Sequence, residues 1–372
     1  MKKIKICLRQ GHHSVYKELI KYPPEGVKYT VPPVVTQSEN KIIDVTKKLL
    51  WRTFIDLLGY PHIVYVNPGD AELIHGCSGI LIKNKKPWVI DVEHVTSFVG
   101  FRAGKLSSRK KIIEDLLSSP YCRKILPWSK GCEKSIKSGL NTSKFSDKIE
   151  VVYPAMHVDE IKKQKHDTVN FLFIGRIFYE KGGREVLKAF DILNKRYDVR
   201  LDMISNVPRE FIDKYRSIVN FAEPNIQREM LLRKYFAKAD VYIMPTYFDT
   251  FGMVYLEALS HGLAVIGSKV YAVPEIVENG KTGLLIDPPI NYYKKDNLFG
   301  WPTWEDFGKA IVKGNYPKTV KEIVKKASIL IEDTNLRKQM SKRGKKEVEN
   351  GKFSIKRRNR QLKRIYEEAI NK

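Results

Sequence analysis

The chain has 372 residues, of which 42% are hydrophobic and 29% are charged, and this is the composition of a globular protein rather than a disordered or fibrous one. The length predicts two domains. The formal net charge of +25 favours anionic partners, and because the basic residues are spread evenly along the chain we expect no dedicated nucleic-acid-binding tail.

Cysteine usage and hydropathy narrow the class further. The four cysteines form no CxxC pair and no Cys/His metal-site spacing, which argues against a zinc module and a secreted disulfide scaffold. No apolar stretch reaches the roughly 18 residues of a transmembrane helix, and the apolar run at Ile4–Leu8 is too short for a signal peptide. We therefore expect a cytoplasmic protein, and the basic balance is compatible with peripheral contact with the anionic inner face of a membrane.

The first half of the chain alternates short apolar runs with helical patterns. Helices are predicted at 41–58, 107–118 and 129–138. Strands are predicted at Ile4–Leu8, His62–Val66, Leu73–Ile74, Trp88–Val92, Arg123–Leu126 and Ile149–Tyr153. This alternation, with nearly continuous apolar strands, predicts an α/β fold in which helices cover both faces of a parallel sheet.

A polar interval at 155–168 is interpreted as a linker, and a second alternating series follows it. Helices are predicted at 181–195, 226–237, 252–261 and 273–278, and the charged tail from 303 to 371 is mostly helical. The predicted strands are Phe171–Ile174, Arg200–Ile204, Val241–Met244, Ala264–Ile266 and Gly283–Ile286. The sequence thus predicts two doubly wound domains with a crevice between them.

One candidate site segment follows the first strand of the second series. The strand ends in Gly175-Arg176, and a turn at Lys181-Gly182 opens the next helix. Gly175 allows a ligand to approach the backbone closely. Arg176 and Lys181 place two cations at the crevice, where they suit a diphosphate group. The alternative interpretation is an arginine and a lysine on a surface turn.

A second segment follows the strand at Val241–Met244. A helix is predicted to start near Gly252, so the amides of residues 251–254 lie at a helix N-terminus, which attracts anions. Glu257 lies about one turn further along, where its carboxylate can accept hydrogen bonds from both hydroxyls of a ribose. The alternative for Glu257 is an acid that only complements the helix dipole.

Together, the two segments resemble the second domain of the retaining glycosyltransferases of family 4 (GT4, the group 1 glycosyl transferases), which have the GT-B fold. That family carries Gly-Arg after a strand, a Lys-Gly turn, and two acids separated by seven residues with Phe-Gly between them. The matching positions are Gly175-Arg176, Lys181-Gly182, and Asp249 and Glu257 around Phe251-Gly252. The resemblance extends over about 170–287 and is weaker in the first half.

The resemblance implies two Rossmann-like domains that face a central cleft. Residues 1–157 would bind the acceptor, residues 158–353 would bind the nucleotide sugar, and a helix within 354–372 would cross back to the first domain. The implied activity is hexosyl transfer from a nucleoside-diphosphate sugar with retention. The acceptor attacks from the face that the diphosphate leaves, and the leaving phosphate takes its proton, so no carboxylate pair is required.

The resemblance also implies a role for each matching residue. Arg176 and Lys181 neutralise the donor diphosphate, Asp249 lies beside the donor sugar and Glu257 holds the ribose. The donor phosphates or sugar hydroxyls bind the backbone amides of Phe251, Gly252, Met253 and Val254. In the first half, His94 contacts the donor sugar and Gly11 lies near the phosphates. The base pocket is formed by the loop that contains Asn225 and Ile226.

His94 has an alternative interpretation as a buried histidine with satisfied hydrogen bonds, and His12 and His13 are either acceptor contacts or a plain loop pair. The sequence departs from the family pattern at Asp249, which replaces a glutamate, and at 271–273, where Tyr-Ala-Val replaces a Gly-Gly turn. That loop is expected to be remodelled around a particular sugar or acceptor.

No Asp-x-Asp motif is present, and we expect transfer without a metal or any other cofactor, with the nucleotide sugar as co-substrate. The acceptor is a glycan, a lipid-linked molecule or a protein, and the sequence names neither the sugar nor the base. Two alternatives remain open. One is a GT-B nucleotide-sugar epimerase or phosphorylase. The other is a basic nucleic-acid-binding protein, although the chain lacks a recognisable nucleic-acid-binding motif, and no nucleic-acid partner is expected.

Overall fold

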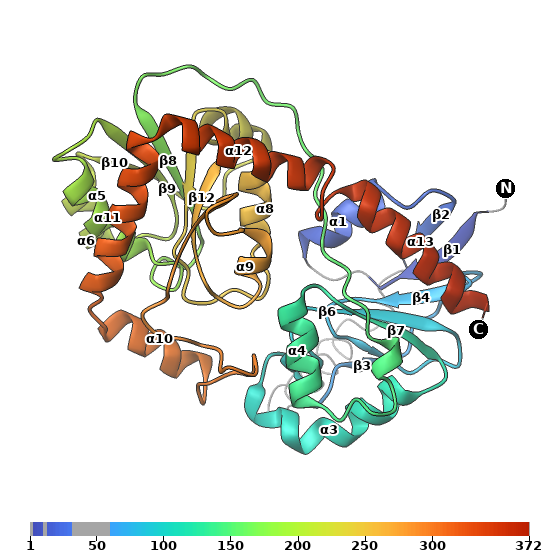
Figure 1. The fold of residues 1–372 in the computed structure, drawn as a ribbon. Coiled ribbons are helices and arrows are strands. Elements are labelled where there is room, and N and C mark those ends of the chain that lie inside the picture. The colour runs from blue at the N-terminus through green and yellow to red at the C-terminus, as the bar shows by residue number, and fades with distance from the viewer. Residues whose placement is uncertain (1–2, 10–12, 32–59, 372) are drawn as a thin grey trace, which may run out of the picture. The chain divides into compact units, whose positions relative to one another are not determined.

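The computed structural model describes residues 3–9, 13–31 and 60–371. It divides into two compact units, and each unit combines stretches that are far apart in sequence. The first unit contains Met1–Pro154, Lys295–Thr303 and Lys356–Lys372, and the second contains Ala155–Lys294 and Trp304–Ile355. The helix predicted at 41–58 lies outside the described residues. Figure 1 labels most of the helices and strands of both units.

In the described part of the first unit, five parallel strands form one sheet in the order β2-β1-β4-β6-β7. Their bounds are Val27–Thr30 for β2, Ile4–Leu8 for β1, Leu73–Gly76 for β4, Trp88–Val92 for β6 and Cys122–Pro127 for β7. A separate pair, β3 (Ile63–Val64) and β5 (Leu81–Ile82), is also parallel. Every residue of β4 and β6 is buried, and their sequences are apolar apart from His75 and Asp91, which lie 3.4 Å apart as a buried pair.

Helices surround this first sheet. The described ones are α1 (Ser14–Lys21), the 3₁₀ helix η1 (Val95–Val99), α3 (Ala103–Ser118), α4 (Lys130–Gly139) and the 3₁₀ turn η2 (Ser146–Lys148). Ser129 begins α4 by accepting a hydrogen bond from the Cys132 amide at 3.0 Å. All four cysteines are buried and none forms a disulfide, as expected for small core residues.

The last helix, α13 (Ile355–Asn371), packs in the first unit although it is the C-terminal element. Its Tyr366 hydroxyl lies 2.8 Å from His75 Nδ1, and Arg358 donates to the Tyr22 carbonyl at 2.8 Å. Gln361 donates to the Val151 carbonyl at 2.9 Å. Through these contacts the C-terminal helix crosses back to the first unit, as the family resemblance implied.

The described residues of the second unit form a sheet of six parallel strands in the order β10-β9-β8-β11-β12-β13. Their bounds are Val219–Ala222, Val199–Ile204, Val169–Ile174, Val241–Ile243, Ala264–Ser268 and Gly283–Ile286, in that order. In chain order the strands read 3-2-1-4-5-6, so the direction of winding reverses between β8 and β11. The two parallel α/β sheets confirm the predicted fold class.

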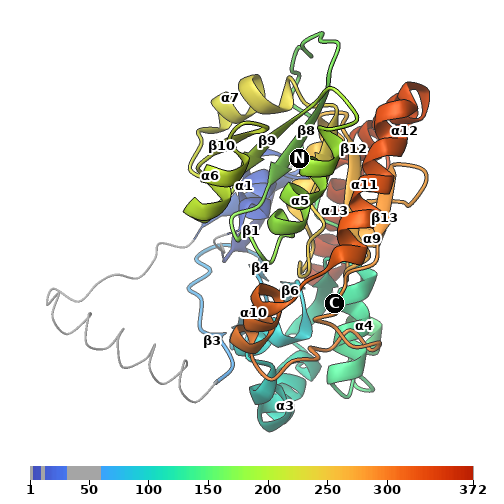
Figure 2. The same ribbon diagram turned by 90° about the vertical axis from the view of Figure 1, so that its left-hand side faces the viewer.

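The second unit carries most of the helices that the structure describes. They are α5 (Gly183–Leu193), α6 (Arg209–Tyr215), α7 (Arg228–Met230) with a π-helical turn (Leu231–Phe236), α8 (Met253–Ser260), α9 (Val273–Ile276), α10 (Trp304–Lys313), α11 (Pro317–Glu332) and α12 (Thr334–Glu349). Helices α11 and α12, drawn in red-orange, are in contact and lie along this unit, with α12 also against α8 and β12 (Figure 2).

Sequence prediction and structure differ mainly at short or polar strands. The segment predicted as a strand at Ile149–Tyr153 makes only one isolated bridge, from Ile149 to Ile125, so that prediction was wrong. It still follows the edge of β7, because the Glu150 and Val152 amides donate to main-chain carbonyls of that strand. The linker prediction holds in one respect, since 155–166 contains no helix or strand.

Candidate functional site

The candidate site of the second unit lies at the carboxyl edge of its sheet. β8 ends at Ile174 and runs directly into Gly175-Arg176, and β11 ends at Ile243 before the loop that reaches Gly252. Because β8 and β11 pair in parallel, both loops leave from the same edge. Ligands of open α/β sheets bind where the strand order reverses. The structure therefore brings together the two segments that the sequence singled out.

Two glycines allow these loops to lie against each other. A Cβ atom on Gly175 would come within 2.8 Å of Lys181 Cβ, so only glycine lets the lysine side chain cross this point. Gly182 has φ of +77°, and a Cβ there would lie 2.4 Å from the Pro245 carbonyl oxygen. The start of α5 is thus held directly against the loop after β11.

Lys181 and Asp249 form an ion pair across these two loops. The Lys181 ammonium lies 2.9 Å from Asp249 Oδ2 and donates to the Phe248 carbonyl at 2.8 Å. Both side chains are partly buried, which strengthens the attraction relative to an exposed pair. A cation and a carboxylate thus lie side by side at the switch point.

Arg176 presents a cation with no ion pair among the described residues. Its side chain is exposed, while its carbonyl accepts a hydrogen bond from the Asn206 amide at 3.2 Å. The main chain is therefore fixed and the guanidinium is available to a ligand. An arginine in this state can bind phosphate oxygens through two parallel hydrogen bonds.

The amino end of α8 is open toward the same edge. Gly252 caps it with φ of +95°, and no side chain accepts a hydrogen bond from its first turn. A Cβ on Gly252 would lie 2.6 Å from Tyr255 Cδ2, so the tight entry requires glycine. Among the described residues, the Met253 and Val254 amides have no acceptor. Phe251 is buried beside them. Such a helix end favours an anion.

Glu257 lies on α8 one turn further and is held by a residue that the sequence analysis missed. Arg228 Nη1 lies 2.7 Å from Glu257 Oε1, and Arg228 Nη2 lies 2.6 Å from Asp159 Oδ2. These contacts join the linker segment, α7 and α8. No local pattern could have revealed them, because residues 159, 228 and 257 are brought together only by the fold.

Asn225 and Ile226 lie in the loop between β10 and α7, also beyond the carboxyl end of a strand. Asn225 is exposed and Ile226 is half-buried. The loop leads into Arg228, which in turn contacts Glu257. The predicted base-pocket loop and the predicted ribose contact are therefore joined through one residue.

Aromatic rings surround Asp249, and the sequence analysis did not single them out. Tyr293 stacks on Tyr271, with ring centroids 4.4 Å apart and planes 14° from parallel, and on Phe248 at 5.6 Å. The Tyr293 hydroxyl donates to the Asp249 carbonyl at 2.9 Å. Tyr271 has φ of +45° and stands where the family pattern has glycine. The departure from the pattern therefore fills this loop with aromatic surface.

His94 lies in the first unit, at the end of β6, and is fully buried at 0% exposure. Nδ1 accepts a hydrogen bond from the Thr96 amide at 3.1 Å, and Nε2 lies 2.7 Å from the Asn297 carbonyl oxygen, so the neutral Nε2–H tautomer fits. The ring stacks on Phe299 at 4.3 Å. We call residues 295–303 the strap. Burial lowers the His94 pKa to about 4.

Three further residues of the first unit, Gly11, His12 and His13, were predicted to lie near the phosphates or the acceptor. Gly11 and His12 lie outside the described residues. His13 is the N-cap of α1, where Nδ1 accepts from the Val15 amide at 3.3 Å, and its ring edge contacts Trp128. His13 therefore has a structural role in this fold. His94 is likewise satisfied by its own unit, as the alternative interpretation expected.

The described residues contain neither a metal-binding cluster nor a membrane-spanning helix. No group of three or more histidine, cysteine, aspartate or glutamate side chains is arranged to hold a metal ion. No described helix is both long enough and apolar enough to cross a membrane.

Residues 168–293, which contain both loops of the candidate site, match the family described as glycosyl transferases group 1. The second unit thus carries the sequence signature of the group 1 (GT4) glycosyltransferases. The matched range covers the sheet switch point, Lys181, Asp249 and Glu257, and this confirms the family that the sequence motifs indicated.

Relatives of this chain include an uncharacterized 41.2 kDa protein in the cps region of Klebsiella pneumoniae. The two are 27% identical over 254 residues, which are 56% of this chain and 68% of that protein. The capsular polysaccharide biosynthesis glycosyltransferase CapM of Staphylococcus aureus is 27% identical over 204 residues, or 53% of this chain and 45% of CapM. The chain thus spans less than half the length of CapM.

Among solved structures, the Anabaena protein HepE in complex with UDP-glucose matches with a TM-score of 0.60 at 13% identity. The match covers 98% of this chain and 99% of HepE. At this identity the likeness establishes the fold alone, and the fold is GT-B. Both halves of the chain therefore have the fold that the sequence predicted, including the less recognisable first half.

Proposed function

We propose that this chain transfers a hexosyl residue from a nucleoside-diphosphate sugar to an acceptor, with retention of the anomeric configuration and without a divalent metal. One observation carries the proposal. The Lys181–Asp249 pair, the exposed Arg176 and the amino end of α8 all lie at the carboxyl edge of one sheet. Together they offer cations and amides to a diphosphate and a carboxylate to a sugar.

In the proposed reaction, the diphosphate competes with Asp249 for Lys181 and draws in the exposed Arg176. The two cations and the α8 amides then stabilise the charge that builds on the diphosphate as the glycosidic bond breaks. The acceptor hydroxyl gives its proton to the leaving phosphate. Asp249, released from Lys181, can accept hydrogen bonds from the donor sugar. A contact between His94 and the donor sugar would require the strap to move away from the ring.

We further propose a UDP-sugar as donor and a polysaccharide or lipid-linked glycan as acceptor. HepE, which shares the fold, was solved with UDP-glucose, and CapM is named for capsular polysaccharide biosynthesis. Glu257 is placed one helical turn from the anion-binding end of α8, which suits a ribose attached to the bound phosphates. The proposal assigns the acceptor to residues 1–157 with the C-terminal helix, and the donor to residues 158–353.

The test is thermal stabilisation of the full chain by UDP, GDP, ADP and CMP, each with EDTA and with magnesium. A ligand of the native state raises the melting temperature. We expect one nucleoside diphosphate, UDP first, to stabilise the chain equally in both buffers, and Arg176→Ala to remove the effect. Lys195→Ala, an exposed lysine after α5, is the matched control. Stabilisation by none of them would refute the donor site.

The alternatives give different products. An epimerase would convert the nucleotide sugar without consuming an acceptor, and a phosphorylase would require inorganic phosphate. A nucleic-acid-binding protein would show salt-sensitive affinity for long oligonucleotides. Product analysis after incubation with the stabilising nucleotide sugar separates these cases from transfer.

A further inference from the structure

A cavity of about 420 Å³ lies at the opposite edge of the second sheet from the candidate site. Its floor is formed by the residues that precede β8 and β11, including Lys163 and Asp240, and one wall is α12. Cavities of this size are in the range that holds small molecules. The length of β8 separates it from Gly175 by roughly 20 Å, so it is distinct from the donor site.

The α12 wall carries a row of lysines that follows from the sequence. Lys338, Lys342 and Lys345 are spaced four and three residues apart, so they share one face of the helix. In the described part of the chain, Lys338 and Lys342 are exposed and have no ion-pair partner, while Lys345 lies 3.5 Å from Glu349. Like charges at this spacing repel one another. The row therefore costs some helix stability.

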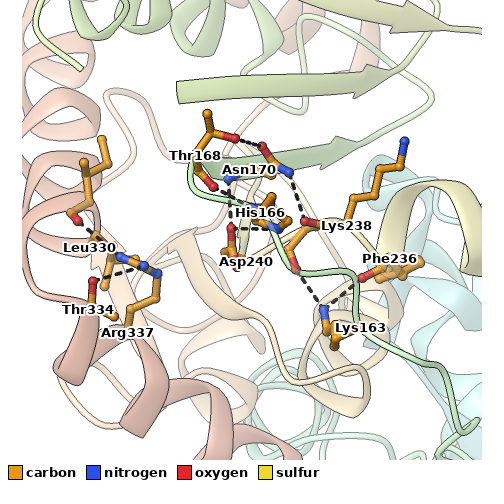
Figure 3. Close-up of polar contacts among 12 residues, drawn as sticks. Lys163, His166, Thr168, Asn170, Phe236, Lys238, Asp240, Leu330, Thr334 and Arg337 are labelled. Carbon is orange, nitrogen blue, oxygen red and sulfur yellow. Dashed lines mark hydrogen bonds and ion pairs between the residues drawn. The ribbon is translucent and has the colours of Figure 1, made fainter. Parts of the chain in front are cut away.

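Two further cations complete the lining, and Figure 3 shows how they are held. Lys163 donates to the Phe236 and Ala239 carbonyls, each at 2.8 Å, which fixes its ammonium at the cavity floor. Arg337 donates to the Leu330 carbonyl and to Thr334 Oγ1, at the junction of α11 and α12. Main-chain carbonyls and a hydroxyl thus hold both cations, although Lys163 is an exposed residue and Arg337 is half-buried.

The negative charge that the cavity residues supply is small. Of the lining residues, Lys163, Arg337, Lys338, Lys342 and Lys345 are cationic, which makes five, and only Asp240 is a carboxylate. Asp240 Oδ2 is already engaged, because it accepts the Asn170 amide at 2.9 Å and lies 3.6 Å from His166 Nε2 (Figure 3). Burial, together with the charge of Lys345, lowers the Lys163 pKa to about 8 despite the attraction of Asp240. The lining therefore carries a net positive charge.

We propose that this cavity binds an anion that carries two or more phosphate groups. Lysine ammonium groups bind phosphate as point charges. Lys338 and Lys345 lie about 10 Å apart along the helix axis, a span that one phosphate cannot bridge. The anion is either a soluble polyphosphorylated molecule or the neighbouring phosphates of anionic lipid headgroups. The proposal does not depend on the proposed donor site.

The experiment is calorimetric titration of the full chain with inorganic tripolyphosphate at fixed ionic strength. We expect Lys338→Gln/Lys342→Gln to weaken binding at least tenfold. Lys321→Gln/Lys325→Gln removes the same charge from exposed positions of the neighbouring helix α11 and is the matched control, with less than a twofold effect expected. Glutamine has a helix propensity close to that of lysine, so all these variants should fold.

An Arg176→Ala/Lys181→Ala chain separates this cavity from the donor site. Tripolyphosphate binding should survive in that chain and disappear when Lys338→Gln/Lys342→Gln is added. The proposal is overturned if the two glutamine pairs weaken binding equally, because that result reports only net charge. It is also overturned if the donor-site variant alone abolishes binding, or if wild-type chain binds no tripolyphosphate.

Sedimentation with vesicles identifies the source of the phosphates. Vesicles of phosphatidylcholine with phosphatidylglycerol are compared with vesicles of phosphatidylcholine alone. Sedimentation with the anionic vesicles that is lost in Lys338→Gln/Lys342→Gln and displaced by tripolyphosphate supports a headgroup site. Cavity-dependent tripolyphosphate binding without sedimentation supports a soluble ligand.

Discussion

The Lys181 ammonium lies 2.9 Å from the Asp249 carboxylate, although the two residues are 68 positions apart in the chain. The sequence motifs assign them to different parts of a donor, the diphosphate and the sugar. In the structure each one neutralises the other. A ligand that binds here must therefore exchange one ionic contact for another, and removing either residue leaves a partly buried charge without its partner.

We expect Lys181→Ala and Asp249→Ala each to lower kcat/KM for sugar transfer by at least about 100-fold, which is roughly 3 kcal/mol. Because the two side chains act as one unit, the double variant should lose much less than the product of the single losses. Steady-state kinetics with the stabilising nucleotide sugar provides the measurement. Asp191 and Lys195 form an exposed ion pair at 3.3 Å, and the same single and double alanine variants of this pair are the control, for which we expect no change in kcat/KM. Strictly additive losses at Lys181 and Asp249 would contradict coupling.

Glu257→Ala should weaken nucleoside diphosphate binding about tenfold or more, because a charge-assisted hydrogen bond to each ribose hydroxyl is lost. Arg228→Ala should weaken it less, since Arg228 only orients Glu257. Arg233→Ala, another exposed arginine in an ion pair, is the control. Titration calorimetry measures each dissociation constant.

A 2′-deoxynucleotide sharpens this test of Glu257. If Glu257 binds the ribose, its loss should matter less for the deoxy compound than for the parent nucleotide. An equal loss for both would place Glu257 elsewhere in the mechanism.

Phe299→Ala should raise the His94 pKa from about 4 toward the ordinary value of 6.5, because removal of the stacked ring admits water to the imidazole. NMR titration of the histidine ring reports the pKa directly. Phe299→Leu keeps the site apolar and should raise it less. A His94 pKa that stays near 4 in Phe299→Ala would mean that the strap is not what buries the ring.

Glu180→Gln should stabilise the protein at neutral pH. Glu180 is buried, and burial raises its pKa from 4.5 to about 6. Between pH 4.5 and 6, the Glu180 carboxyl is therefore protonated in the folded state and ionised in the unfolded state. Because of this difference, the free energy of unfolding of the wild-type protein falls as the pH rises from 4.5 through 6. A glutamine does not ionise, so it avoids this decrease in the free energy of unfolding, which amounts to about 2 kcal/mol above pH 6. Denaturant unfolding should show that Glu180→Gln raises the free energy of unfolding at pH 7 and changes it little at pH 4.5. An increase that is the same at both pH values would show that ionisation of Glu180 is not the cause.

Much of the second unit was predictable, and the reason is visible in its strands. Gly283–Ile286 was predicted with its observed bounds, and β8 and β12 within two residues, because buried parallel strands are unbroken apolar runs. The strand β10 was missed because Val219–Ala222 is short and includes a polar, exposed Asn220. Two-residue strands such as β5 carry too little pattern to be read from sequence.

The candidate site was predictable where its parts follow strand ends and not where tertiary packing supplies a partner. The closeness of Gly175, Lys181 and Asp249 follows from parallel strands that end at one edge. The contact of His94 with Asn297 spans 203 positions, and that of Arg228 with Glu257 spans 29. Neither pair has a local signature, so a sequence could name His94 and Glu257 but not what holds them.

The division of the chain into units has a consequence for the order of folding on the ribosome. The second unit is complete once residue 355 has been made, whereas the first still lacks α13, from which Arg358 and Tyr366 reach Tyr22 and His75. Domains generally fold in order from the amino terminus during synthesis. Here the first unit is completed last, because it needs α13. A chain that stops before Lys356 would contain every residue of the second unit but would leave exposed the surfaces of the first unit that α13 covers.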